Sequence, residues 1–276
     1  MGKLIDGNKI ARRIETALIK KIRRLKSQTK VPKLVVVLVG ADKSSRKYVE
    51  KKRARAEKIG VLFELKKFPA GVTTRELLAA IRKIQTDQSS NGLIIQLPLP
   101  KQIDKNKILN AVRPEIDVDC LNAKNQLKLA KGQKTFLPPT PAAILEILKS
   151  LKIKFKNKTV AVIGQGLLVG KPITAILRQR GARVKVGNQA TDLKKLCLDA
   201  DIIITGAGKR NLVTKAMVRK DAVVIDAGIT FVGKKLYGDA DWKNIQRVAK
   251  YVTPTPGGVG PITVSCLLRN VVENTK

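Results

Sequence analysis

Tyr48 and Lys52 are four residues apart in the segment KYVEK, so a helix through this segment would place both side chains on one face. A lysine can act as a base where its surroundings disfavour its charged form. Taken alone the pair is weak evidence, because 56 of the 276 residues are Lys or Arg and such a spacing arises easily by chance. A reactive lysine here would need partners from elsewhere in the chain.

Three other polar side chains could belong to a ligand site. Gln96 ends the apolar run GLII, and open α/β sheets present their ligand-binding groups at the ends of buried strands. Asp117 and Asp119, in PEIDVDCLN, would point the same way from an extended chain. The alternative is that these two carboxylates only make a loop polar or cap a helix.

Two glycine-rich segments offer bare backbone to a ligand. In VIGQGLLVGKP, Gly164, Gly166 and Gly170 follow a strand-like run, and Pro172 suits the first turn of a helix. Backbone there can approach a phosphate, and the helix N-terminus supplies N–H groups with a partial positive charge. This context favours a dinucleotide over a merely tight turn. The second segment, TPTPGGVGP at 253–261, precedes a helix-like run, which favours a ligand contact over a linker.

An alternation of helices and strands must position these residues. We expect a first helix from about Gly7 to Ser27, and a second that is capped by Ser44 or Ser45 and closed by Gly60. A third begins near Thr73. The expected strands of this first half are 33–40, 61–68 and 92–95. Such alternation implies parallel strands joined by crossover helices, hence an α/β fold.

The stiff segment LPPTP at 137–141 interrupts this order, and the alternation then restarts. The expected elements are strands at 159–164, 182–186, 201–206 and 221–229 and a helix from Lys171. We therefore predict two α/β domains. Residues 1–138 form the first, which is catalytic and has a parallel sheet, and 139–260 form a Rossmann-type dinucleotide-binding domain. The C-terminal helix, 261–276, begins at Pro261 and returns to the first domain.

The composition excludes several kinds of chemistry. The chain has no histidine, which rules out an imidazole base, a Ser-His-Asp triad and a His-ligated zinc. Cys120, Cys197 and Cys266 lack metal-ligand spacing, so we expect no metal site and reduced thiols in a cytoplasmic protein. No apolar run approaches a membrane span, and the start lacks the apolar segment of a signal peptide.

The formal net charge is +35. Such a field would attract RNA non-specifically, and it would equally steer small polyanions. Nine aromatic residues are too few for a base-stacking platform, so we expect nucleic-acid binding to be non-specific at most. We interpret the charge mostly as a solvated, lysine-rich surface.

Nearly the whole chain resembles the methylenetetrahydrofolate dehydrogenase/cyclohydrolase family of the FolD type. The resemblance lies in the order of GADKSSRKYVEKK, GLIIQLPLP, PEIDVD, PPTP, VIGQGLLVGKP, ADIIITGAG, VVIDAGI, YGDAD and TPTPGGVGPIT. It implies oxidation of 5,10-methylenetetrahydrofolate to the methenyl form with NADP, NAD being possible. It further implies hydrolysis of the methenyl form to 10-formyltetrahydrofolate in one-carbon metabolism, and a homodimer.

The resemblance also implies roles for single residues. Lys52 is then the catalytic lysine, which Gln96 orients. Tyr48 stacks on the folate and Asp119 holds the pterin. Further folate-binding residues by this resemblance are Ser45, Leu97, Pro98, Gly260, Pro261 and Val264. The cofactor-binding residues by this resemblance are Gly164, Gln165, Gly166, Val169, Gly170, Pro172, Gln189, Thr191 and Ile229.

The residue types suit this chemistry. Hydride loss yields a stabilised cation, so that step needs positioning more than a base. Water must then attack the one-carbon centre of the cation. A lysine that faces a cationic substrate among other cations has its charged form disfavoured and can accept a proton. A carboxylate can accept two parallel N–H bonds from the amino-pyrimidinone edge of the pterin.

The sequence departs from the family pattern at four segments. The glycine loop usually reads G-R-S-x-x-V-G, with Arg and Ser on the NADP 2′-phosphate, but here it has Gln165 and Gly166. The usual C-H-S is Gly187 to Gln189. K-D-V-D-G has become 116–120, and P-C-T-P-x-G has lost its Cys and Gly at Pro139 and Ala143. The Lys-Gln-Asp set is intact, so the hydrolase prediction is firmer than the dehydrogenase one.

These departures leave alternatives open. One is a cyclohydrolase whose nicotinamide site has decayed, and another is a basic RNA-associated protein that reuses the fold. For a functional cofactor site we predict NADP over NAD with weak discrimination. Lys185, Lys194 or Lys195 could replace the missing arginine as a point charge.

Overall fold

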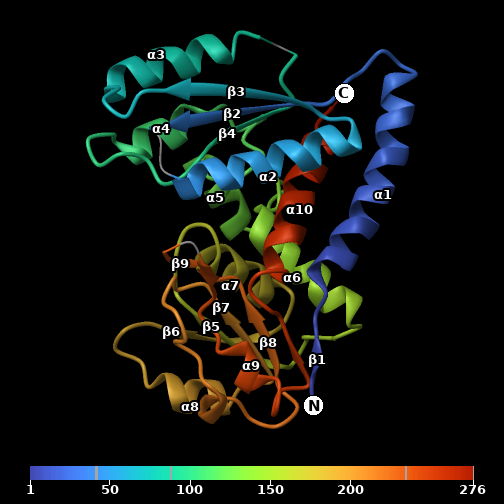
Figure 1. The fold of residues 1–276 in the computed structure, drawn as a ribbon, viewed down its shortest axis with the longest axis vertical. Coiled ribbons are helices and arrows are strands. Elements are labelled where there is room, and N and C mark those ends of the chain that lie inside the picture. Colours follow the sequence, from blue (N-terminus) through green and yellow to red (C-terminus); the bar gives the residue numbers. More distant parts are fainter. Residues whose placement is uncertain (41–42, 88, 234, 276) are drawn as a thin grey trace. The chain divides into compact units, whose positions relative to one another are not determined.

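The computed structural model describes residues 1–40, 43–87, 89–233 and 235–275, which form two compact units (Figure 1). The Lys52 unit consists of Arg13–Pro139 and Val264–Lys276, and the glycine-loop unit consists of Met1–Arg12 and Thr140–Thr263. The division falls inside helices α1 (Gly7–Lys26) and α10 (Val259–Glu273). Each unit has a parallel central sheet, so the predicted α/β fold class is confirmed.

The Lys52 unit is built on a three-stranded parallel sheet of order β3-β2-β4. The central strand β2 (Lys33–Val39) is buried from Leu34 onward, as expected of a continuous β-branched run that is covered on both faces. It pairs with β3 (Leu62–Phe68) on one side and β4 (Gly92–Ile95) on the other. The strand β4 is buried although it lies at the edge of the sheet, so the residues that follow it leave the sheet beside the end of the central strand.

Crossover helices join these strands. Helix α3 (Thr74–Ile84) begins with a capping box, in which Thr73 and Glu76 satisfy each other's backbone N–H groups. Helix α2 spans Lys43–Ile59. The prediction that Ser44 or Ser45 caps it was wrong, because both serines lie inside its first turn, and residues 41–42 before it are outside the described part of the chain.

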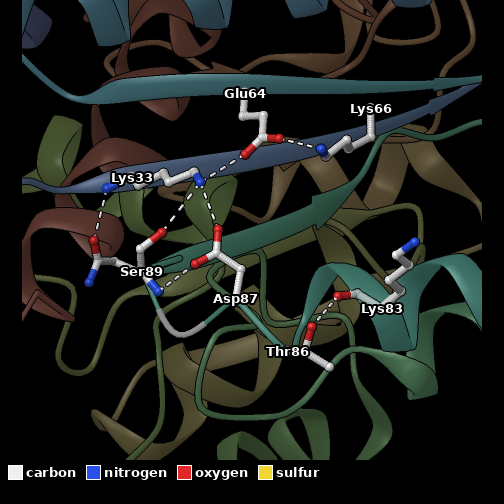
Figure 2. A network of polar contacts seen from close by, with 8 residues as sticks. Lys33, Glu64, Lys66, Lys83, Thr86, Asp87 and Ser89 are labelled. Carbon is white, nitrogen blue, oxygen red and sulfur yellow. Dashed lines mark hydrogen bonds and ion pairs between the residues drawn. The ribbon is translucent and has the colours of Figure 1, made fainter.

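A polar network closes the start of this sheet (Figure 2). The Lys33 ammonium contacts the Asp87 carboxylate at 2.8 Å and the Glu64 carboxylate at 2.9 Å, and it donates to Ser89 at 3.3 Å. Glu64 also pairs with Lys66. These contacts raise the pKa of Lys33 and lower the pKa of Asp87. The network ties β2 to β3 and to the segment after α3, on the exposed rim of the unit.

The second half of α10 packs on this unit through two asparagines. Asn270 donates to the Val118 carbonyl at 2.8 Å and to the Leu137 carbonyl at 2.9 Å. Asn274 donates to the carbonyls of Asn91 and Glu115. The helix begins at Val259, and Pro261 lies in its first turn. The prediction that the helix begins at Pro261 was therefore wrong by two residues.

The glycine-loop unit has a six-stranded sheet of order β1-β11-β8-β7-β5-β6. All its pairings are parallel. Its strands are β1 (Lys3–Leu4), β5 (Thr159–Ile163), β6 (Arg183–Gly187), β7 (Ile202–Thr205), β8 (Val223–Asp226) and β11 (Tyr251–Val252). The order reverses around β5, because the next strand, β6, lies on one side of it and β7 on the other. Such a reversal is the usual ligand-binding position of an open α/β sheet.

The predicted domain 1–138 was wrong at its beginning. Lys3 pairs with Tyr251 and Leu4 with Val252, so the first residues extend the sheet of the glycine-loop unit. The Ile5 N–H continues the ladder to the Val252 carbonyl at 2.9 Å. The exposed edge of β11 offers unpaired backbone groups, and the N-terminal segment satisfies them.

The remaining elements are short. They are α4 (Lys105–Ala111), α5 (Ala123–Ala130), α6 (Pro139–Ser150), α7 (Gly170–Gln179), α8 (Leu193–Leu198), the 3₁₀ turn η1 (Lys215–Met217), the β9–β10 hairpin (Thr230–Val232, Lys235–Tyr237) and α9 (Trp242–Ile245). LPPTP thus leads directly into α6. Among the described residues, no helix has the length and apolar character that crossing a membrane requires.

Candidate active and cofactor sites

Helix α2 and the end of β4 bring Lys52 and Gln96 together. The Lys52 ammonium donates to Gln96 Oε1 at 2.9 Å, and Gln96 Nε2 donates to the Leu97 carbonyl at 2.7 Å. Gln96 is only 8% exposed. Since its amide N–H is engaged by the backbone, its carbonyl oxygen is held toward Lys52. The geometry thus agrees with the predicted orienting role of Gln96.

The surroundings of Lys52 weaken its hold on a proton. Burial lowers the pKa of Lys52, and the negative charge of Asp119 opposes this lowering only in part. Burial likewise raises the pKa of Asp119, against the opposing charge of Lys52. The two groups therefore act on each other inside a partly buried site. A lysine whose pKa is lowered gives up its proton more easily and is better suited to act as a base.

Ser45 and Tyr48 lie on the Lys52 face of α2, at helical spacings of three and four residues. Ser45 is 3% exposed, and burial raises the pKa of the Tyr48 hydroxyl. The ammonium of Lys51 lies 5.9 Å from the centre of the Tyr48 ring. Of the other predicted folate residues of this unit, Leu97 is half-buried, Pro98 is exposed and Val264 is buried.

Asp117 and Asp119 have different roles. The segment that holds them is turned and not extended, so the expectation that both point the same way from extended chain was wrong. Asp117 accepts the backbone N–H groups of Leu121 at 3.1 Å and Asn122 at 2.9 Å, and Asn125 donates to it as well. It is a structural carboxylate that holds the start of α5. Asp119 is the carboxylate whose charge acts on Lys52.

The glycine loop after β5 approaches its own helix very closely. A Cβ on Gly170 would lie 1.8 Å from the Gly164 carbonyl oxygen, and Gly164 itself has φ of +87°. Gly170 opens α7, and Val169 before it makes no side-chain capping bond. The helix N-terminus therefore presents backbone N–H groups without a capping side chain, as a phosphate-binding terminus does. This backbone cradle fits a dinucleotide.

The side chains of this loop play a minor part. Gln165 turns inward, where its amide donates to the Gly164 carbonyl at 3.0 Å and to Thr174 Oγ1 at 3.4 Å. Gly166 is exposed, and a Cβ there would have no atom within 4 Å. Pro172 is buried in the first turn of α7, as its predicted place requires. Gln165 thus braces the loop from within.

The other predicted cofactor residues lie in loops of the same unit. Thr191 and Asn188 close a turn after β6 through reciprocal hydrogen bonds, and Gln189 in that turn is exposed. Ile229, after β8, is 44% exposed. Lys185 is paired with Asp199 at 3.3 Å, which leaves exposed Lys194 and Lys195 as the better candidates for a phosphate charge.

Gly260 and Pro261 belong to the glycine-loop unit, whereas Val264 belongs to the Lys52 unit. That these three residues bind folate together stays a prediction.

Sequence reasoning did not identify two buried carboxylates, Asp226 and Asp239. They lie in the segments VVIDAGI and YGDAD, and nothing in their spacing signals that the fold brings them together.

Comparisons with known proteins agree with this arrangement. Residues 5–119 match the catalytic domain, and residues 138–276 the NAD(P)-binding domain, of the tetrahydrofolate dehydrogenase/cyclohydrolase family. The bifunctional protein FolD of Nautilia profundicola is 42% identical over 99% of this chain and 97% of its own length. That of Macrococcus caseolyticus is 40% identical over 99% and 98%.

Solved structures give the same result. A FolD crystal structure from Campylobacter jejuni has a TM-score of 0.96 at 35% identity and covers 99% of this chain and 98% of that one. The Trypanosoma brucei enzyme complexed with NADP and an inhibitor has a TM-score of 0.95 at 32% identity, with 99% and 97% covered. The chain belongs to the tetrahydrofolate dehydrogenase/cyclohydrolase family, and the resemblance found in the sequence is confirmed.

Proposed function

We propose that the chain oxidises 5,10-methylenetetrahydrofolate to the methenyl form with NADP and hydrolyses the methenyl form to 10-formyltetrahydrofolate. The observation that carries this proposal is the half-buried Lys52 ammonium, which lies 2.9 Å from Gln96 Oε1 and is influenced by the negative charge of Asp119. The family to which the chain belongs has both activities in its name. One-carbon metabolism is then the process that the protein serves.

In the hydrolysis, Lys52 is the base. Its lowered pKa favours the neutral amine, which accepts a proton from the water that attacks the one-carbon centre. Gln96 fixes the position of the amine by accepting its hydrogen bond. Asp119 accepts two N–H groups from the pterin edge and so sets the distance between the one-carbon centre and Lys52. Tyr48, on the same helix face, supplies a flat surface for the folate rings.

The oxidation depends on the glycine loop. The first turn of α7 with Gly164, Gly166 and Gly170 would hold the phosphates of NADP through backbone N–H groups, and the nicotinamide would supply a hydride acceptor. Lys194 and Lys195 supply positive charge near the end of β6. The chain's own part in this step is to place the two reactants and to exclude water.

The test follows the absorbance of methenyltetrahydrofolate in the presence and absence of each nicotinamide cofactor. Appearance of the methenyl band with NADP, and its decay without any nicotinamide, are the expected results. Decay without appearance would support the alternative of a cyclohydrolase whose nicotinamide site has decayed. Neither signal would refute the proposed function.

We further propose a cytoplasmic homodimer. The three cysteines are buried thiols, which suits a reducing compartment, and the family resemblance implies a dimer. Light scattering at several concentrations tests the dimer, and a monomer throughout would refute it. For nucleic acid we expect only weak, salt-sensitive binding, because the charge of +35 acts without base readout.

A further inference from the structure

Asp239 is a completely buried carboxylate that accepts several hydrogen bonds from one loop. It accepts Thr205 Oγ1–H at 2.8 Å and the backbone N–H groups of Ala207 at 2.6 Å, Gly208 at 3.3 Å and Lys209 at 2.8 Å. Because three successive backbone N–H groups donate to one carboxylate, the backbone conformation of this segment is strongly restricted. Asp239 therefore fixes residues 205–209, the loop that follows β7.

This loop borders the glycine loop. Strands β5 and β7 are parallel neighbours, so the segments that follow them leave the same edge of the sheet. A Cβ on Gly164 would lie 2.9 Å from the Gly206 carbonyl oxygen, and a Cβ on Gly206 would lie 2.9 Å from Cγ1 of Val169. The two loops are thus packed backbone against backbone at the point where the strand order reverses. Residues 205–209 form the second wall of the dinucleotide cradle.

The outer surface of this wall is bare. Gly208 has φ of +70°, and the nearest atom to a Cβ there would be the Ile229 carbonyl oxygen at 3.9 Å. A ligand can therefore approach the loop without meeting a side chain at that position. Ile229, which the family resemblance placed at the cofactor, borders the same position.

Asp226 stands behind Asp239. It is 2% exposed, and it accepts the backbone N–H groups of Gly228 at 2.8 Å and Ala240 at 2.9 Å. A Cβ on Gly228 would lie 2.1 Å from Asp239 Cγ, and one on Gly238 would lie 1.9 Å from Asp226 Oδ2. Asp239 thus lies against Gly228, two residues after Asp226, and Asp226 lies against Gly238, which precedes Asp239. The loops after β7, β8 and β10 are joined through this pair.

Two buried like charges are an expensive way to hold a fold together. Burial, with the charge of Asp239, raises the pKa of Asp226 to about 6, which shows the cost of keeping it ionised. Apolar residues of similar volume often stabilise a protein as well or better than buried charges. What the carboxylates provide instead is a fixed backbone geometry at the sheet edge.

We infer that Asp239, with Asp226 behind it, is a positioning residue for the cofactor: it holds loop 205–209 in the shape that binds the dinucleotide. The inference rests on the proposed dehydrogenase function. Asp239 touches neither substrate nor cofactor directly in this account. It acts through the loop, so its removal affects the nicotinamide-dependent reaction and leaves the Lys52 chemistry of the other unit unchanged.

The test compares Asp239→Asn with Asp241→Asn. Asp241 is a matched carboxylate two residues away, and it bonds Asn244 outside the buried pair. An asparagine at 239 turns one acceptor into a donor that faces the loop N–H groups. We expect NADP to bind at least 10-fold more weakly by calorimetry and the KM for NADP to rise alike. Methenyl hydrolysis without nicotinamide should stay within about 2-fold, and Asp241→Asn should match wild type in both.

A milder variant protects the test against misfolding. Thr205→Val keeps the shape of the side chain and removes only the hydroxyl bond to Asp239, so we expect NADP binding about 3-fold weaker. Unchanged NADP affinity in folded Asp239→Asn and in Thr205→Val would overturn the inference, as would equal loss of both activities. A wild type that binds NADP without oxidising methylenetetrahydrofolate would refute the proposed oxidation, while the NADP affinities would still decide the role of Asp239.

Discussion

The two candidate sites differ in whether side chains or the backbone supply their functional groups. Around Lys52 the chemistry lies in side chains, with an ammonium, an amide and a carboxylate drawn from α2, the end of β4 and the turn at Asp119. Around Gly164 and Gly170 it lies in the backbone, where the loop and the helix approach so closely that no side chain fits. A side-chain site depends on residue identity. A backbone site depends on the path of the chain.

This difference explains how the family pattern has changed in this chain. The departures at Gln165 and Gly166 leave Gly164 and Gly170 in place, and Gln165 braces the loop from within. Lys52, Gln96 and Asp119 themselves are unchanged, although Ile116 and Cys120 in the Asp119 segment depart from the family pattern. The dinucleotide cradle can therefore persist while its preference among nicotinamide cofactors weakens.

The largest effect should come from removing the base. Lys52→Met leaves a side chain of similar length without a proton acceptor, so methenyl hydrolysis should fall about 10³-fold. Absorbance of the methenyl form measures it, and circular dichroism should show an unchanged fold. Lys47→Met, an exposed lysine on the same helix, is the control and should behave as wild type. Hydrolysis within tenfold of wild type in Lys52→Met would show that another group is the base.

The next largest effect should come from filling the backbone contact. Gly170→Ala forces a Cβ to within 1.8 Å of the Gly164 carbonyl, so it should cost about 3 kcal/mol of unfolding free energy and abolish NADP binding. Gly166→Ala, where a Cβ meets no atom within 4 Å, is the matched control and should fold normally. Urea unfolding and calorimetry measure both. Equal stability of the two variants would contradict the close approach.

The third effect concerns pH and the buried pair. Because the folded pKa of Asp226 is raised from 3.8 to about 6, the native state binds the extra proton between these values. Stability from this group is therefore highest below pH 4 and is lost as pH rises through 6. Between pH 4.5 and 7.5 wild type should lose about 2 kcal/mol relative to Asp226→Asn. Parallel pH curves of unfolding free energy for the two proteins would contradict this.

The fourth effect separates the two neighbouring aspartates. Asp119→Asn should raise the KM for folate about 10-fold, since one charged acceptor is lost. It should also move the acid limb of hydrolysis to lower pH, because Asp119 raises the pKa of Lys52 and its charge would be gone. Asp117→Asn should instead lower stability, because Asp117 holds the backbone of Leu121 and Asn122. Reversed phenotypes would exchange their roles.

The two sites also differ in how far the sequence predicts them. The Lys52–Gln96 pairing was predicted from the family resemblance, whose motifs here are a helical spacing and a glutamine at a strand end, and both features are local. The glycine loop is local too. The Asp226–Asp239 pair is not, because twelve residues, which include the β9–β10 hairpin, lie between its members, and no periodic pattern connects them.

The N-terminal strand shows the same limit. Lys3 and Leu4 are too short a segment to carry a strand pattern, and their pairing with β11 comes from a free sheet edge. The turn at Asp117 and Asp119 was also missed, because alternating polar and apolar residues in PEIDVD resemble a strand. In each case a tertiary contact decides the local conformation, and a short window of sequence contains no information about that contact.

The smallest effect concerns cofactor choice. Gln165 bonds within its own loop and offers no charge, Gly166 has no side chain, and Lys185 is paired with Asp199. Only point charges such as Lys194 and Lys195 then favour the additional phosphate of NADP, so wild type should prefer NADP over NAD by a small factor. Gln165→Arg adds a bidentate partner and should raise that preference a further few-fold. The ratio of kcat/KM for the two cofactors measures it, with Gln179→Arg, a similar charge at the far end of α7, as control. A strong native preference for NAD would refute the predicted choice of NADP. An equal rise in Gln179→Arg would show that the general potential, and not the loop, sets the preference.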